Sequence, residues 1–186
     1  MTQTGTKRAD ARRNREKLLT AAVELFATAG TEVSLDAVAK RAGLGIGTLY
    51  RHFPTRDALV EAAYRNEVAQ LCEAAGELLA EHPPDVALAE WMDRFVAYST
   101  TKKGMKGALQ AAVAGSGSDL FAATRAQIVD AIAALLAAGV AAGTLRSDVD
   151  AEDVMRAMGA VWQVDEEDQA RRLLRLLMDG LRHGAG

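Results

Sequence analysis

Residues 35–64 read LDAVAKRAGLGIGTLYRHFPTRDALVEAAY and form the most informative stretch of this 186-residue chain. The pattern predicts two short helices joined by a turn that contains Gly43. Ser34 precedes the first helix as an N-cap. Pro54 ends the second helix, because the residue before a proline avoids the helical region. Two short helices joined by a glycine-containing turn are the helix-turn-helix pattern.

The second helix is predicted from about Ile46 to His52, and its apolar residues fix which side faces inward. Leu49 and Phe53 lie four residues apart, so they share one face and can dock, with Leu44, on the helices before them. The opposite face then carries Gly47, Thr48, Tyr50 and Arg51.

In a helix-turn-helix the second helix enters the major groove of DNA. Gly47 permits a close approach, Thr48 can bond a base edge, and Ile46 can contact a thymine methyl. Tyr50, His52 and Arg56 carry donors for phosphate oxygens, and Ser34 and Thr55 add helix-start amides that favour anions. We therefore expect the DNA contacts to come from Ser34, Ile46, Gly47, Thr48, Tyr50, Arg51, His52, Thr55 and Arg56.

A purely structural helix-turn-helix would show the same apolar residues. Packing does not explain why Tyr50, Arg51, His52 and Arg56 crowd beside a glycine on the exposed side. The charge distribution agrees with an N-terminal third that binds a polyanion. Residues 1–65 hold 11 Lys and Arg against 7 Asp and Glu, a net charge of +4. The remaining 121 residues hold 11 bases against 18 acids, a net −7. Such asymmetry suggests a DNA-binding head on a body with another task.

The whole chain is predicted to be all-α. Hydrophobic residues make up 49% of it, there are three prolines, and no stretch alternates apolar and polar residues as a strand does. We expect a helix-turn-helix domain at 1–54 and a helical ligand-binding and dimerisation domain at 55–186. Nine helices are predicted in all, those outside the motif at about 10–29, 55–81, 85–101, 105–114, 119–143, 150–161 and 168–182.

Other classes of protein find little support. A single cysteine, Cys72, rules out an internal disulfide framework, and the polar, basic start is unlike a signal peptide. No run of about 18 apolar residues predicts a membrane span, so a cytoplasmic location is expected. The histidines lack ligand partners at helical spacing, and no nucleophile–base pair is apparent. We expect no metal, no cofactor and no enzymatic activity.

The segment resembles the DNA-binding domain of the tetracycline-repressor (TetR) family. The resemblance rests on residues 35–64 and on the preceding REKLLTAAVELFATAG at 15–30, above all on GTLYRHF followed by Thr-Arg-Asp-Ala-Leu. It covers about the first third of the chain. It implies a homodimeric regulator, usually a repressor, that a small molecule releases from DNA. It also implies that Tyr50, His52 and Arg56 contact phosphates.

The match departs from the family pattern at two places. Many members carry a polar pair where this chain has Gly45-Ile46, which leaves the base contacts open. Arg56 replaces a common lysine and conserves only the charge.

The last two helices are the candidates for dimerisation. They present more apolar surface than one helical pair can hide, and a twofold copy would complete a four-helix bundle. Ordinary core packing within one chain is the rival explanation. A dimer would bind a near-palindromic operator in double-stranded DNA, with recognition helices roughly 34–36 Å apart. The expected interface residues are Val154, Met158, Val161, Leu173, Leu176, Leu177 and Leu181.

A sensing pocket is expected between the long helix after Thr55 and the middle helices. Few charges fall there, so an uncharged or weakly polar effector is favoured, although Lys102, Lys103 and Lys106 nearby leave an acidic one open. Simple core packing is the alternative for every member of the set. The candidate lining is Trp91, Phe95, Tyr98, Met105, Leu109, Phe121, Thr124, Ile128 and Trp162.

Two functions therefore stay in view. The first is a ligand-released dimeric repressor. The second is a dimeric DNA-binding regulator that has no small ligand and uses its body for protein contacts. A cavity of several hundred Å³ in the body would separate them.

Overall fold

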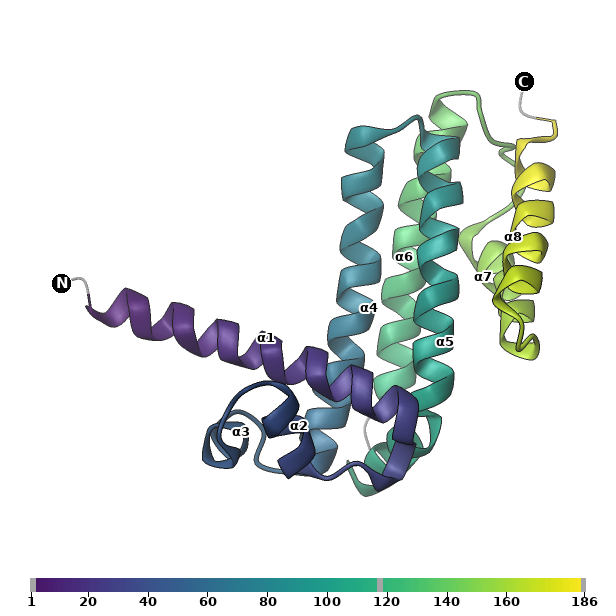
Figure 1. Cartoon of the computed structure of the whole chain (residues 1–186). Coiled ribbons are helices and arrows are strands. Elements are labelled where there is room, and N and C mark those ends of the chain that lie inside the picture. Colours follow the sequence, from purple (N-terminus) through teal and green to yellow (C-terminus); the bar gives the residue numbers. More distant parts are fainter. Residues whose placement is uncertain (1–2, 117–118, 185–186) are drawn as a thin grey trace. The chain divides into compact units, whose positions relative to one another are not determined.

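The computed structural model describes residues 3–116 and 119–184, and no strand occurs among them (Figure 1). This confirms the all-α prediction. Two 3₁₀ segments, η1 at Gly30–Glu32 and η2 at Gly159–Gln163, accompany the α-helices. The α-helices are α1 Gln3–Ala29, α2 Leu35–Arg41, α3 Ile46–His52, α4 Arg56–Glu81, α5 Pro84–Ser116, α6 Leu120–Ala141, α7 Ala151–Met158 and α8 Glu167–Arg182.

The described residues hold eight α-helices, not nine, because α5 runs unbroken through the interruption expected near residues 102–104. Gly104 and Gly107 stay helical. A helical glycine costs only about 1 kcal/mol relative to alanine. Buried neighbours on the same helix, among them Met105 and Ala108, favour continuing it.

Helix α1 starts at Gln3, seven residues before the expected position. The extra residues 3–9 end in the good helix formers Lys7, Arg8 and Ala9. The turns that follow carry ion pairs at helical spacing, between Arg13 and Asp10 at 2.6 Å and between Arg12 and Glu16 at 3.5 Å. Each such pair adds about 0.2–0.5 kcal/mol to a helix. The basic N-terminal segment is therefore helical.

The chain divides into two compact units. Unit 1 comprises Met1–Asn66 and Thr101–Leu120, and unit 2 comprises Glu67–Thr100 and Phe121–Gly186. Helices α4 and α5 each contribute residues to both units. The expected limit between residues 54 and 55 concerns the extent of the DNA-binding domain, and it stays a prediction.

Side-chain caps set the helix starts where the sequence predicts them. The Ser34 Oγ accepts from the Ala37 amide and the Thr55 Oγ1 accepts from the Ala58 amide, both at 3.1 Å. Asp150 and Asp153 form a reciprocal capping box at the start of α7. Each cap satisfies an amide that the helix itself leaves without a partner, which stabilises the start by about 0.5–2 kcal/mol.

The core of unit 1 joins α1, α2 and α3, with α1 packed on α2 and α2 packed on α3. Its side chains are at most 3% exposed and come from widely separated positions in the sequence, so burying them fixes the three helices against one another. They include Leu18, Leu19, Ala22, Phe26, Val38, Ala39, Leu49 and Phe53.

The core of unit 2 is built on α5 and α6. The indole Nε1 of Trp91, a fully buried side chain, donates to the Leu71 carbonyl at 2.7 Å. Helix α6 is long and apolar enough to cross a membrane by length and composition, with a mean hydropathy of 1.5 over 18 residues. Its Ile128, Ile132 and Leu135 are buried inside the unit, as in a core helix of a folded domain.

Candidate nucleic-acid interface

Helix α3 is held against unit 1 by one face only. Leu49 is fully buried and Phe53 is 3% exposed. The turn before α3 is closed by Gly43, whose φ of +68° is a conformation that L side chains rarely adopt. The Leu44 amide donates to the Ala39 carbonyl at 2.9 Å and completes that turn. This is the helix-turn-helix arrangement that the sequence predicts.

The other face of α3 is open. Tyr50 on this face is 50% exposed, and Ile46, the first residue of α3, is 38% exposed. A Cβ added to Gly47 would meet nothing within 4 Å, so the backbone itself is accessible there. Thr48 is half-buried and Arg51 is exposed. The face that we expect to meet DNA therefore projects from the surface.

His52 lies at one edge of this face. It is half-buried, and its ring centroid is 6.2 Å from that of Phe53. With Thr48 and Arg51 it lines an open cavity of about 360 Å³ whose other wall is α1, at Asp10, Ala11 and Asn14. The N-terminal half of α1 thus runs beside the outward face of α3.

Arg56 has a position that the sequence did not indicate. Its Nη2 donates to the Thr31 carbonyl at 2.8 Å, and its Nη1 donates to the Val33 carbonyl. The guanidinium also lies 4.8 Å from the centre of the Phe26 ring. These contacts give Arg56 a structural role, and we expect that role to replace the phosphate contact predicted from the sequence. The two carbonyls lie 25 and 23 residues earlier in the chain, so no local sequence pattern signals this role.

Ser34 and Thr55 are exposed, and each hydroxyl oxygen already accepts a backbone amide as a cap. Each hydroxyl proton remains available to a phosphate oxygen. Both residues stand at the starts of helices, as the sequence predicts.

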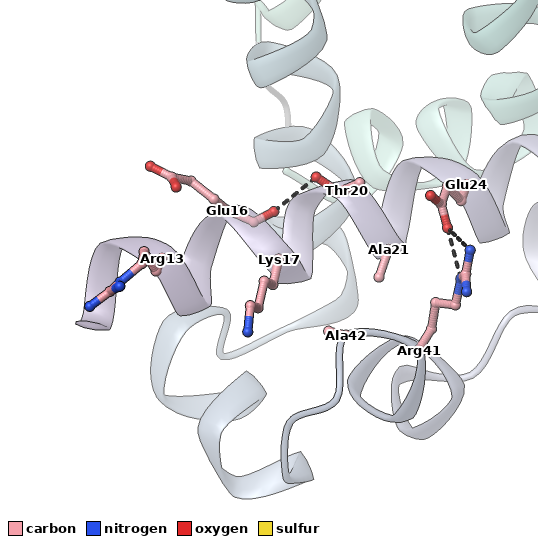
Figure 2. Close-up of a pocket in the computed structure, with 8 residues that line it drawn as sticks. All are labelled: Arg13, Glu16, Lys17, Thr20, Ala21, Glu24, Arg41 and Ala42. Carbon is pink, nitrogen blue, oxygen red and sulfur yellow. Dashed lines mark hydrogen bonds and ion pairs between the residues drawn. The ribbon is translucent and has the colours of Figure 1, made fainter. Parts of the chain in front are cut away.

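A second groove in unit 1, which sequence reasoning missed, lies between α1 and the end of α2 (Figure 2). Its volume is about 440 Å³. Arg41 spans it and contacts Glu24 through Nε at 2.8 Å and Nη2 at 2.7 Å, while Lys17 extends from α1 towards the turn after α2. Cations and carboxylates alternate along it, so the groove favours neither an apolar ligand nor a simple anion.

The predicted sensing residues are mostly packed as core. In unit 2, ring centroids lie 6.0 Å apart for Trp91 and Phe95 and 5.7 Å apart for Phe95 and Tyr98. Thr124 and Ile128 are also buried in unit 2, whereas Met105 and Leu109 are buried in unit 1.

One member of that set, Phe121, does not fit it. Phe121 is 40% exposed and stands in the first turn of α6. The side chain of Trp162 lies outside the described residues. One polar group was missed: the Ser99 hydroxyl of α5 is buried and has no hydrogen-bond partner.

The predicted dimer set is only partly at the surface. Val154, Met158, Val161 and Leu181 are at most 3% exposed inside one chain, so the core-packing alternative is correct for them. They are covered because α7 and η2 pack on α8, whose inward residues recur every three or four positions. Leu173 and Leu177 are half-exposed and Leu176 is 69% exposed.

Cys72 on α4 is half-buried, and its pKa is raised to about 11. Burial is the main cause, and the carboxylates of Asp130 and Glu73 add to it. Such a thiol stays protonated near neutral pH and is a poor nucleophile. Among the residues 3–116 and 119–184, no group of three or more His, Cys, Asp or Glu is arranged to hold a metal ion.

Comparisons with known proteins agree with this geometry. Residues 18–63 match the profile of the bacterial regulatory proteins of the tetR family, and residues 83–183 match the SbtR-like transcriptional regulator C-terminal domain. The TetR transcriptional regulator SCO0520 from Streptomyces coelicolor is 48% identical, with 90% of this chain and 98% of that chain covered and a TM-score of 0.82. The TetR regulatory protein from Mycobacterium vanbaalenii is 38% identical, covering 94% and 98% with a TM-score of 0.77.

A curated relative, the HTH-type transcriptional regulator SAR0097 of Staphylococcus aureus strain MRSA252, is 32% identical over 105 residues. Those residues are 51% of this chain and 54% of that protein, so the chain spans about half the length of this relative.

Proposed function

Because the chain belongs to the TetR family of transcriptional regulators, which are not enzymes, we propose that it is a homodimeric repressor of a near-palindromic operator that a small molecule releases from DNA. One observation carries the DNA-binding part. Helix α3 is anchored by Leu49 on one face and projects an accessible Gly47 and a half-exposed Tyr50 on the other.

Affinity for DNA comes largely from phosphate contacts, and base contacts add specificity. Tyr50 and His52 flank the outward face of α3 and carry donors for the two phosphate backbones of a groove. Ser34 and Thr55 add hydroxyl donors at helix starts. Ile46, Gly47, Thr48 and Arg51 occupy the part of α3 that would meet base edges.

Dimerisation is supported by α8. Leu176 is 69% exposed, and Leu173 and Leu177 lie half-exposed beside it at helical spacing. An exposed cluster of leucines gains about 25 cal/mol for each Å² of apolar surface that a partner covers. A second copy of the chain, placed by twofold symmetry, would cover both clusters at once. The dimer would hold the two α3 helices roughly 34–36 Å apart, one turn of DNA.

The effector part of the proposal depends on family membership and on unit 2. Its buried aromatic rings and the unpartnered Ser99 hydroxyl favour an uncharged or weakly polar compound. Such a compound releases DNA only if it binds the DNA-free conformation better, and a coupling of about 1–3 kcal/mol would lower operator affinity about 5- to 150-fold. The tight packing of the same rings favours a second candidate, a dimeric regulator that responds to protein contacts. Either regulator would act in the cytoplasm, where the chromosome lies.

The test is selection of bound duplexes from a random pool, followed by footprinting and by a screen of metabolites that abolish binding. We expect a near-palindrome whose half-sites are about one helical turn apart. Failure to enrich any duplex at low ionic strength would contradict the DNA-binding function. An enriched operator that no metabolite releases would favour the second candidate.

A further inference from the structure

Arg51 is the outermost side chain of the recognition helix α3. The buried residues Leu49 and Phe53 define the inward direction of that helix. Arg51 lies two positions from each of them, and two positions correspond to about 200° of rotation around a helix. Its side chain therefore leaves α3 directly opposite the core. If α3 enters the major groove by its outward face, Arg51 stands at the centre of that face.

The guanidinium of Arg51 is held in one place. Its Nε donates to the Gly47 carbonyl at 3.2 Å, and its Nη2 donates to the Thr48 Oγ1 at 3.0 Å. Long side chains on a helix point back towards its N-terminus. Thr48 is half-buried, and its hydroxyl oxygen is the acceptor for Nη2.

The remaining donors of Arg51 are uncommitted. A guanidinium has five N–H groups, and these contacts use two of them. Arg51 forms no ion pair in the described part of the chain. Asp10 lines the same open cavity, but its carboxylate pairs with Arg13 at 2.6 Å. The outer edge of the guanidinium, with both Nη1 protons and one Nη2 proton, is left for a ligand.

We propose that Arg51 reads a guanine in each half-site by donating to its O6 and N7, and that Thr48 is the positioning residue that orients the guanidinium. Paired acceptors at this spacing in the major groove are found on guanine, and arginine matches them bidentately. The inference rests on the proposed DNA-binding function. It transfers base recognition from Thr48, where the sequence suggested it, to Arg51.

The first experiment repeats the random-pool selection with the full-length wild-type protein, Arg51→Ala and Arg51→Lys. The wild type should select a guanine at one position of each half-site, and exchanging that G·C pair should weaken binding about 5- to 150-fold, the usual range for one bidentate contact. Both variants should still bind DNA but lose the preference at that position. Lysine keeps the positive charge, so its loss of preference separates bidentate recognition from general attraction.

Modified bases identify the atoms. Replacing the selected guanine by 7-deazaguanine removes N7 and should weaken the wild type but not Arg51→Ala. Inosine lacks only the minor-groove amino group and should bind the wild type like guanine.

Thr48 is tested by two variants. Thr48→Ser keeps the hydroxyl and should keep the guanine preference, whereas Thr48→Val has the same shape without the acceptor and should reduce it. Thermal unfolding of each variant should match the wild type, because the positions are not in the core.

Two failures are distinguishable. A wild type that selects no duplex would overturn the proposed function itself. A wild-type palindrome that Arg51→Ala selects with unchanged base preferences would overturn only the role of Arg51.

Discussion

Arg56, the first residue of α4, donates from its Nη2 to the backbone carbonyl of Thr31 at 2.8 Å. The same guanidinium donates to Val33 and covers the Phe26 ring. Arg56 therefore fastens the corner between α1 and α2 to the start of α4 within unit 1.

Replacing Arg56 by alanine should destabilise unit 1 by about 1.5–3 kcal/mol, the usual value of hydrogen bonds from a charged group. Chemical denaturation would measure this. The slope of log Kd against log salt concentration should stay as in the wild type, because the guanidinium faces carbonyls. A slope smaller by about 0.9 would show a phosphate contact instead. Arg65→Ala, at an exposed position of the same helix, is the matched control and should change stability by less than about 0.5 kcal/mol.

Tyr50→Phe removes a hydroxyl from a ring that is 50% exposed. We expect affinity for operator and for random duplex to fall by the same factor, about 2- to 12-fold, which corresponds to one hydrogen bond of about 0.5–1.5 kcal/mol. Fluorescence anisotropy with both duplexes measures it, and the melting temperature should not change. A loss confined to the operator would assign Tyr50 to base recognition.

Gly104→Ala should destabilise the protein by about 1–3 kcal/mol or more. A Cβ at this position of α5 would lie 2.8 Å from both the Cα and the carbonyl carbon of Ala27, so one backbone must move. Gly76→Ala is the control, because Gly76 is an exposed helical glycine with nothing within 4 Å of an added Cβ. That change should stabilise the protein by about 0.5–1 kcal/mol. Equal changes in stability for Gly104→Ala and Gly76→Ala would contradict the close approach of α5 to Ala27.

Leu176→Glu tests the proposed dimer contact. Leu176 is 69% exposed within one chain, so the fold should survive, while a charge placed in an apolar interface should shift the protein to monomers. Sedimentation velocity measures the shift, and operator affinity should fall with it. Gln169→Glu adds the same charge at another exposed position of α8 and should leave the oligomeric state unchanged. A Leu176→Glu protein with wild-type mass would place the interface elsewhere.

Glu67 should make stability depend on pH. Burial raises the pKa of this carboxyl in the folded chain, so folding favours its protonated form. The contribution of Glu67 is therefore greatest below its unfolded pKa and is lost as pH rises through the folded one. Glu67→Gln mimics the protonated form and should raise the melting temperature at pH 7 more than at pH 4. The same gain at both pH values would exclude the titration of Glu67 as its source.

Local signals made much of this molecule predictable from its sequence. The caps at Ser34, Thr55 and Asp150 depend on residues three positions away. The inward face of α3 follows from the spacing of Leu49 and Phe53. These features lie within one or two helical turns, where the pattern of residues decides the structure.

Features that depend on distant partners were not predictable. The apolar periodicity predicted both Val154 and Leu176 at the dimer interface, yet the fold buries Val154 and exposes Leu176. Periodicity shows which face of a helix is apolar but not which surface covers that face. Arg56 contacts carbonyls more than twenty residues earlier in the chain, and no local pattern in the sequence signals those contacts. The break expected near Gly104 is absent because that glycine is held within a helix by contacts with α1.

The bare backbone at Gly104 also restricts how α5 can turn. Helix α5 meets Ala27 where it has no side chain, and rotation by one residue, about 100°, would bring Lys103 or Met105 to the same point. Neither side chain fits in the space that Gly104 leaves. Helix α5 is therefore restricted to a single rotational orientation about its own axis within unit 1. A rotation of α5 about its axis must therefore either be blocked at Gly104 or move the end of α1 together with α5.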